Sequence, residues 1–191
     1  MLSKGHDFAN VTLVGIVDAD SQLFSTDFRA EERLAQTIVQ VAGRAGRAAI
    51  PGEVLIQTHH PHHELLQTLI SDGYDRFAER ALAERRAAEL PPFVPMALIR
   101  AEAPGAQAPL NFLRELRTRA ALPERAGLDI LGPIPAAMEK KAGRYRAQLM
   151  LTASSRKRLA ASVKALIAAS ETLSAARSVR WSIDIDPQDT L

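Results

Sequence analysis

A continuous apolar run near the start of the chain limits what the chain can fold into. Residues 11–18 read VTLVGIVD, a stretch rich in branched side chains that ends on Asp18 and is soon followed by Asp20. Such a run is typical of a strand that is buried on both faces of a parallel sheet. The two acidic residues are then expected at the carboxyl edge of that sheet, where α/β proteins hold their sites.

The residues after this strand continue a strand–helix order. A helix is expected from about Asp27, as its N-cap, to about Ala45, and a second strand over residues 52–58. Two helices follow, over residues 63–70 and 74–89. This order predicts an α/β layer. Because two strands are too few for a complete sheet, the segment is expected to be the latter part of a larger domain, with apolar strand faces and an edge exposed in this chain.

The second half of the chain has a different organisation. Residues 90–92 (LPP) interrupt the helical pattern and predict a boundary between two domains, residues 1–90 and residues 91–191. The elements expected beyond it are a strand at 94–101, a helix at 109–121, strands at 128–131 and 144–152, a helix at 155–176 and a strand at 179–185. This irregular order predicts a small α+β unit with its helices on one face of a sheet.

Residues 40–47 (QVAGRAGR) place an amide and two guanidiniums on one side of the first expected helix. Their spacing puts Gln40, Arg44 and Arg47 on one face. The opposite face carries the apolar residues expected to be buried, which are Leu34, Ile38, Val41 and Ala45. Two planar guanidiniums on a packed element suit a nucleoside triphosphate, because each can bond phosphate oxygens in pairs. Arginines at this spacing are also typical of a solvated face, but the two glycines of the run favour close approach of a ligand or neighbour.

Composition narrows the function classes. The 191 residues carry a net charge of +2, so the chain is not a general polycation. The absence of cysteine excludes disulfides and thiolate metal sites, and it fits a reducing cytoplasm. No apolar run in the sequence reaches the roughly 20 residues that a membrane-spanning helix needs.

Basic residues concentrate in one block. Residues 139–158 hold seven basic residues and one acidic one. The turn at residues 140–146 (KKAGRYR) can bind phosphates and carries an aromatic ring that can stack on a base. The candidate DNA-binding residues of this turn are Lys140, Lys141, Arg144, Tyr145 and Arg146. The same composition is also typical of a solvated hairpin.

Three other constellations favour structural interpretations. Residues 59–63 (HHPHH) are expected to connect a strand to a helix, with His62 or His63 at the helix start, rather than to bind a metal. A serine at residues 154–155 is expected to cap the long helix, although three cations in its first turn oppose the helix dipole and hint at a nearby anion. Asp184 and Asp186 alternate on a strand and are expected on one solvated face, without a metal.

Several stretches together resemble a known family. Residues 1–8 (MLSKGHDF) resemble motif V of superfamily 2 helicases, and residues 40–47 match their motif VI, Gln-x-x-Gly-Arg-x-Gly-Arg. Further stretches resemble the PriA family of primosomal helicases, namely 18–20 (DAD), 23–30 (LFSTDFRA), 57–61 (QTHHP), 90–92 (LPP), 143–146 (GRYR) and 181–187 (WSIDIDP). The ordered set covers almost the whole chain and is more specific than motif VI, which by itself indicates only a helicase.

The resemblance implies a fold and an activity. Residues 1–90 would be the latter part of the second RecA-like helicase lobe, and residues 91–191 the family's C-terminal α+β domain. Whole members are cytoplasmic, ATP-dependent helicases that unwind DNA with 3′-to-5′ polarity. They recognise stalled forks, D-loops and single strands, and they act in replication restart and primosome assembly with other primosome proteins.

The resemblance also implies site residues. Gln40, Arg44 and Arg47 would contact ATP, with Arg44 and Arg47 catalytic and Arg47 as the arginine finger. The motif V residues that would lie near DNA are Lys4, Gly5 and His6. Arg144 and Gln148 would line a basic pocket that docks the acidic C-terminal tail of single-strand DNA-binding protein.

The chain lacks other parts of the family's machinery. It has no Gly-x-x-x-x-Gly-Lys-Ser/Thr loop for phosphates and no Asp-Glu-x-His segment for Mg²⁺, and the family's cysteine-rich zinc insertion is missing, so ATP, magnesium and zinc sites are expected only in the full-length protein. The chain is expected to be a C-terminal piece that is inactive as an ATPase alone. A stand-alone module that binds nucleic acid or a partner, and a piece of another superfamily 2 helicase, are the alternatives.

Overall fold

The computed structural model describes residues 11–43, 52–122 and 127–190. Its contacts divide the chain into two compact units, residues 1–84 and residues 85–191. The division falls ahead of the predicted boundary at residues 90–92, because the end of the last helix before it packs against the residues just after that helix. Leu90 N donates to Arg85 O at 2.9 Å, and the Arg86 guanidinium lies 4.6 Å from the ring centroid of Phe93. The domain assignment itself stays a prediction.

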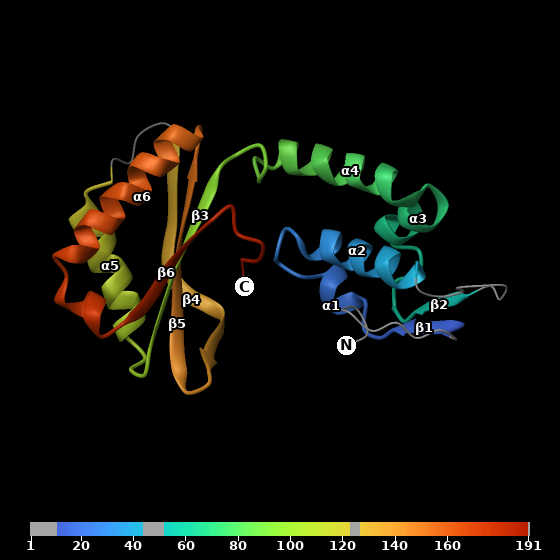
Figure 1. The fold of residues 1–191 in the computed structure, drawn as a ribbon, viewed down its shortest axis with the longest axis horizontal. Helices are drawn as coiled ribbons and strands as arrows, with labels where there is room; N and C mark the ends of the chain where they lie inside the picture. Colours follow the sequence, from blue (N-terminus) through green and yellow to red (C-terminus); the bar gives the residue numbers. More distant parts are fainter. Residues whose placement is uncertain (1–10, 44–51, 123–126, 191) are drawn as a thin grey trace. The chain divides into compact units, whose positions relative to one another are not determined.

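The first unit contains a two-stranded parallel sheet with helices. Its elements are β1 (Leu13–Ile16), α1 (Asp20–Leu23), α2 (Ala30–Ala42), β2 (Glu53–Ile56), α3 (Glu64–Ser71) and α4 (Gly73–Ala87). β1 and β2 pair in parallel, with Val14 opposite Val54 and Ile16 opposite Ile56. Figure 1 shows α2 and α3 on one side of this pair. The mixed α/β class expected for the segment is confirmed, and α1 is an addition to the predicted elements.

Helix α2 begins later than the sequence suggests. Asp27 was expected to be its N-cap, but the N-cap is Arg29, which makes no side-chain capping bond. The Asp27 carboxylate is buried and bonds instead to Arg33 Nη2 at 2.8 Å and to the backbone N–H of Arg29 at 2.9 Å. A buried carboxylate needs such partners, and satisfying them fixes the turn before the helix. Leu34, Ile38 and Val41 are buried as predicted.

Among the described residues of this unit, the sheet is covered on one face. Ile16 and Ile56 pack against the apolar cluster formed by α2, α3 and Phe77 of α4. Leu13 and Leu55, which alternate with them, are 55% and 52% exposed, and Val17 is 76% exposed. The expectation that both strand faces would be exposed in this chain is therefore wrong for one face and confirmed for the other.

This arrangement predicts unequal resistance to proteases. A two-stranded sheet with one bare face is marginal in water, so residues 1–84 are expected to be cleaved well before residues 85–191. Limited trypsin digestion followed by mass spectrometry of the surviving core measures this. Equal survival of both units would contradict the expectation.

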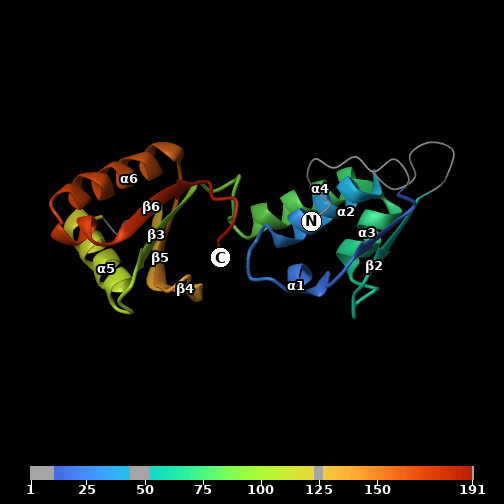
Figure 2. The same ribbon diagram turned by 60° about the horizontal axis from the view of Figure 1, so that its bottom comes forward.

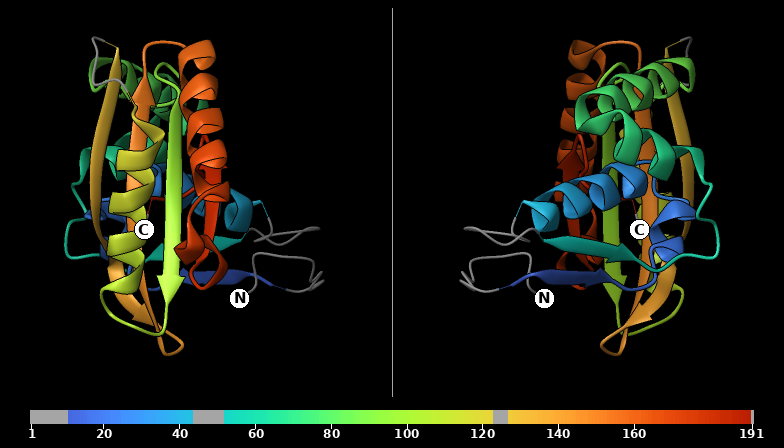
Figure 3. Two further views of the ribbon diagram at one scale, coloured as in Figure 1. Left: turned by 90° about the vertical axis from the view of Figure 1, so that its left-hand side faces the viewer. Right: turned by 90° about the vertical axis from the view of Figure 1, so that its right-hand side faces the viewer.

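The second unit is a four-stranded antiparallel sheet with helices on one face. Its elements are β3 (Met96–Ala103), α5 (Ala108–Ala120), β4 (Leu128–Lys141), β5 (Arg144–Ala153), α6 (Arg156–Glu171), the 3₁₀ helix η1 (Ser174–Arg177) and β6 (Arg180–Ile185). The strand order is β4-β5-β3-β6. Figures 2 and 3 show α5 and α6 on the same face of this sheet. The opposite face carries no helix of this unit among its described residues.

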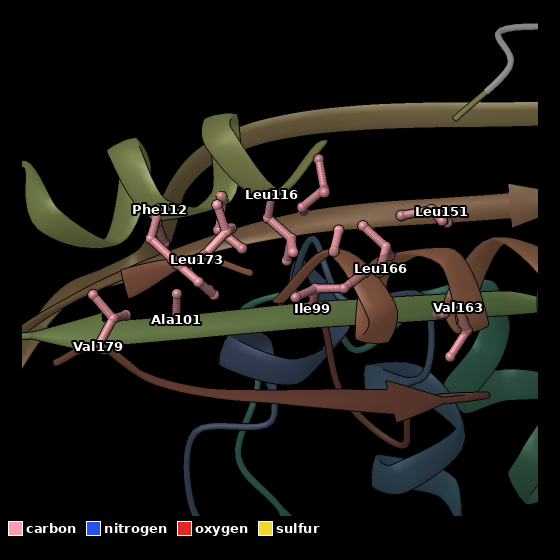
Figure 4. Packing of buried hydrophobic residues seen from close by; sticks show 14 of the residues in the cluster. Ile99, Ala101, Phe112, Leu116, Leu151, Val163, Leu166, Leu173 and Val179 are labelled. Carbon is pink, nitrogen blue, oxygen red and sulfur yellow. The ribbon is translucent and has the colours of Figure 1, made fainter. Parts of the chain in front are cut away.

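Small residues on the central strand let the helices approach closely. Ala97, Ile99, Ala101 and Ala103 of β3 all point into the main apolar cluster, together with Leu149 and Leu151 of β5. Figure 4 shows Phe112 and Leu116 of α5 and Val163 and Leu166 of α6 gathered over these strands. The alternate residues of the same strands are therefore left for the helix-free face.

Two elements differ from the predicted lengths. The strand expected at residues 128–131 continues to Lys141, with irregular pairing after Leu131 and again after Pro135. This strand lies at an edge of the sheet and contains two prolines, Pro133 and Pro135, which edge strands tolerate.

The helix expected at residues 155–176 ends at Glu171. Ser170 Oγ donates to Ile167 O at 2.7 Å and Thr172 Oγ1 donates to Ala169 O at 2.8 Å, so hydroxyls compete for the last carbonyls of the helix. Within the described residues, no helix has the length and apolar content that crossing a membrane requires.

Candidate binding groove

A groove of about 490 Å³ lies on the second unit, mainly along the helix-free side of the sheet. Its charged and amide-bearing lining residues are Arg100, Glu102, Lys141, Arg144, Arg146, Gln148 and Arg180. We call this surface the basic groove. Five of these residues are cations and one is a carboxylate, so an anionic ligand is favoured there.

Strand alternation places these side chains together. Ile99 and Ala101 face the helices, so Arg100 and Glu102 face the opposite way. Arg100 lies directly opposite Gln148 of β5 and Ser182 of β6, and Glu102 lies opposite Arg146 and Arg180. The central strand thus aligns polar residues from three strands across one face.

Glu102 contacts two of the arginines that line the basic groove, Arg144 and Arg180. Arg144 Nη2 donates to Glu102 O at 3.2 Å, while Arg144 Nε and Arg180 Nη1 lie 3.4 and 3.5 Å from Glu102 Oε1. Arg144 Nε is buried and, within the described residues, has no aligned hydrogen-bond acceptor despite its ion-pair distance. The single Glu102 carboxylate therefore faces two guanidiniums, and the three side chains together carry one net positive charge.

Two further groups of the groove are available to a ligand. Within the part of the chain that the structure describes, the Gln148 side-chain amide makes no hydrogen bond and Arg146 makes no ion pair. Both side chains are half-buried, so they are partly removed from water while their polar ends lack protein partners in that part. The two residues expected from the resemblance to line a pocket, Arg144 and Gln148, are brought together here.

The hairpin between β4 and β5 extends this positive surface. Ala142 and Gly143 both adopt positive φ, at 48° and 78°, which is typical of a tight hairpin turn. Lys140 and Lys141 are exposed, and Lys140 Nζ lies 4.8 Å from the ring centroid of Tyr145. The ring is half-buried, so one of its faces is already engaged by a cation.

Sequence reasoning missed Arg100 and Arg180 as groove residues. Arg100 Nη1 donates to Asp184 Oδ2 at 3.0 Å, and its Nη2 donates to the main-chain and carboxylate oxygens of Asp189 at 2.6 and 2.9 Å. The alternation of charged residues with Ala and Ile in β3 was a signal that could have found Arg100. Arg180 belongs to the groove because β6 pairs with β3 so that Arg180 lies opposite Glu102. The residues next to Arg180 in the sequence give no sign of this pairing.

The two aspartates near the end of β6 are not on one solvated face, which corrects the prediction. Asp184 bonds to Arg100, whereas Asp186 follows the strand with a φ of 52° and bonds to Arg156 Nη1 at 2.8 Å. Asp186 is therefore the anion that faces the cationic first turn of α6. The expected serine cap of that helix is confirmed, because Ser155 Oγ accepts from Arg158 N at 3.3 Å.

The nucleotide and DNA motifs of the first unit lie mostly outside the described residues. This applies to Lys4, Gly5, His6, Arg44 and Arg47. Gln40 is described and lies exposed on α2, and the convergence of Gln40 with the two arginines stays a prediction.

The carboxyl ends of β1 and β2 are tied together by one aspartate. Asp20 accepts hydrogen bonds from Thr58 Oγ1 and, at 2.9 Å, from His59 N. The Thr58 hydrogen bond, followed by that of His59, lowers the pKa of Asp20 from its ordinary value. His63 Nδ1 accepts from Leu65 N at 3.3 Å and caps α3, as expected for the histidine run. Among the described residues, no three His, Asp or Glu side chains are placed to hold a metal ion.

Comparisons with known proteins assign the family. Residues 86–188 match the family model described as the primosomal protein N C-terminal domain. The chain is 49% identical over 189 residues to the replication restart protein PriA of Haemophilus influenzae, covering 99% of this chain and 26% of that protein. It is 34% identical over 196 residues to the replication restart protein PriA of Bacillus subtilis, covering 98% of this chain and 23% of that protein. The chain thus spans about a quarter of the length of these relatives, and it belongs to the PriA family of replication restart proteins.

Proposed function

We propose that this chain serves as the C-terminal part of an ATP-dependent 3′-to-5′ DNA helicase of replication restart, and that its second unit docks the acidic C-terminal tail of single-strand DNA-binding protein. The basic groove carries this proposal, because it brings the Arg144 guanidinium and the Gln148 amide together among further cations. A guanidinium offers paired donors to a carboxylate, and a neighbouring amide can bond a peptide backbone.

The electrostatics of the groove favour a short acidic peptide. Its five cations outnumber the carboxylates that face them, which are Glu102 in the lining and Asp184 and Asp189 at Arg100. Arg146 and Gln148 keep unpaired polar groups within the described residues. The exposed Ile134 of β4 lies opposite Gln148, at the margin of the groove, and offers an apolar contact beside the charges. A peptide that carries both carboxylates and an apolar side chain can therefore contact the cations and Ile134 at the same time.

For the first unit we propose the latter part of a RecA-like lobe. The parallel β1–β2 pair with α2 on one face suits that assignment. The exposed Leu13 and Leu55 on the other face suit a sheet that packs against further elements in a whole lobe. In the whole protein, which would also hold Mg²⁺, Gln40, Arg44 and Arg47 would contact ATP, and Lys4, Gly5 and His6 would lie near DNA. The phosphate-binding loop would come from another part of the protein, so ATP hydrolysis is not an activity of this chain by itself.

Charge reversal at Arg144 tests the docking proposal. Fluorescence anisotropy would follow a fluorescein-labelled peptide that carries the acidic C-terminal sequence of single-strand DNA-binding protein, titrated with the 191-residue chain. Arg144→Glu is expected to weaken binding at least about tenfold, because a charge-assisted bond is lost and a second carboxylate joins Glu102. Binding of the unchanged chain should weaken as salt is raised.

Arg119→Glu is the matched control. Arg119 is exposed on α5, on the helix-covered side of the same unit, and its reversal changes net charge equally. It should alter affinity less than about twofold, because an exposed charge away from the groove is screened by salt. An equal loss of peptide affinity in both variants would mean that the peptide is attracted by the net charge of the chain and not by the groove, which would contradict the proposal. Unchanged peptide affinity in Arg144→Glu would contradict it as well.

A single-stranded oligonucleotide is the second ligand in the same titration. The exposed Lys140 and Lys141 favour phosphate binding at the hairpin. Tyr145→Ala should weaken oligonucleotide binding more than peptide binding, since only bases stack on the ring. The reverse order would exclude a base-stacking role for Tyr145.

A further inference from the structure

The C-terminal segment of this chain already provides an acidic ligand to the basic groove. Arg100 lines the groove, and its Nη2 binds two oxygens of one residue, the main-chain oxygen of Asp189 at 2.6 Å and the Asp189 carboxylate at 2.9 Å. Figures 1 and 2 show the segment after β6 on the side of the sheet away from α5 and α6, which is the side on which Arg100 points.

We propose that Asp189 is an internal ligand of Arg100, which lines the basic groove, and that an acidic peptide binding in the groove competes with Asp189 for this guanidinium. This inference rests on the proposed peptide docking function. It adds Arg100 as a ligand-binding residue and makes the chain's own end a competitor.

The contact made by Asp189 is the kind that an acidic peptide makes. One residue in an irregular segment supplies both a side-chain carboxylate and a main-chain carbonyl to one guanidinium. Arg100 lines the groove from β3, which lies between β5 and β6, opposite Gln148 on one side and Ser182 on the other. An incoming peptide that reaches Gln148 is therefore one strand away from Arg100.

The Asp189 side chain is the part of this segment that a ligand can displace, because Pro187 and Thr190 on either side of it are buried. The Asp189 side chain is 59% exposed, whereas that of Arg100 is 24% exposed. An ion pair with one partner this exposed contributes little and is screened by salt. Asp184, the other carboxylate on Arg100, belongs to β6 and is held by the sheet, so it stays when the Asp189 side chain leaves.

Two variants of the 191-residue chain test the competition with the labelled acidic peptide. One variant ends after Pro187, and the other is Asp189→Asn, which removes one charge and keeps the main chain. Each is expected to bind the peptide about two- to fivefold more tightly, the range set by the loss of one exposed ion pair. Glu171→Gln is the control, because it removes one carboxylate at the end of α6, on the helix-covered side. It should change affinity by less than the other two.

A second readout does not depend on affinity. Amide chemical shifts of residues 186 and 188–190, measured by NMR, should move in Arg100→Ala as the Asp189 side chain is released. Addition of the acidic peptide to the unchanged chain should move the same amides toward their Arg100→Ala positions.

The outcomes separate this inference from the proposed function. Peptide binding that depends on Arg144 but is unchanged by removal of residues 188–191 overturns the competition and leaves the docking function standing. Amides of residues 186 and 188–190 that do not respond to Arg100→Ala overturn the contact itself. No peptide binding by either the unchanged or the shortened chain overturns both proposals.

Discussion

Leu166→Ala is expected to lower the free energy of unfolding of the second unit by about 3 kcal/mol, within the range of roughly 2–5 kcal/mol for large-to-small core substitutions. Leu166 of α6 is 0% exposed and lies in the cluster with Ile99 and Leu116. Its loss leaves a cavity that the closely packed β3 cannot fill by moving. Urea unfolding followed by Trp181 fluorescence measures the loss, because Trp181 is the only tryptophan and packs 5.8 Å from Phe112 in this unit.

The neighbouring residue provides a matched control. Ile167 lies on the same helix but is 45% exposed. Ile167→Ala removes a side chain of the same volume and should cost less than about 1 kcal/mol. Similar losses in the two variants would show that α6 does not pack as described.

Gly132→Ala is expected to destabilise the second unit by about 2–4 kcal/mol and to weaken peptide binding. Gly132 has a φ of 101°, which strains any residue with a Cβ. An added Cβ would lie 2.9 Å from Gln148 O and 3.0 Å from Ile134 N, so backbone would have to move. That movement displaces the strand that presents Gln148 to the basic groove. Urea unfolding and the peptide titration measure the two effects.

Gly143→Ala separates backbone strain from the clash. Gly143 also has a positive φ, of 78°, but a Cβ there would meet no atom within 4 Å. It should cost about 1–2 kcal/mol, the strain alone. Equal costs at the two glycines would contradict the close approach of Gly132 to β5.

The elements that follow from side-chain periodicity were predictable from the sequence. The apolar residues Leu34, Ile38 and Val41 of α2, the strand over residues 144–152 and the Ser155 cap each depend on residues near in sequence, and each is found as expected, while the predicted burial of Ala45 lies outside the described residues. Asp27 could not be assigned in this way, because its carboxylate bonds to Arg33 one turn into the helix instead of capping it. The break after Glu171 depends on hydroxyls that bond to helix carbonyls, which composition does not reveal.

The candidate site was predictable in part. The resemblance singled out Arg144 and Gln148, and β5 presents both to one groove. The alternation in β3 indicates that Arg100 faces away from the helices, but its place beside Arg144 and Gln148, like that of Arg180, depends on the strand order β5-β3-β6, which no local pattern encodes. The grouping of Gln40 with Arg44 and Arg47 stays a prediction, since both arginines lie outside the described residues.

The two prolines of β4 affect how separate molecules meet. A free sheet border can recruit a strand from another molecule, and such pairing needs N–H donors along the border. Pro133 and Pro135 have none, and the irregular pairing around them further disturbs the ladder. A strand from a second molecule therefore cannot pair along the full length of β4. This limits self-association of the protein at high concentration.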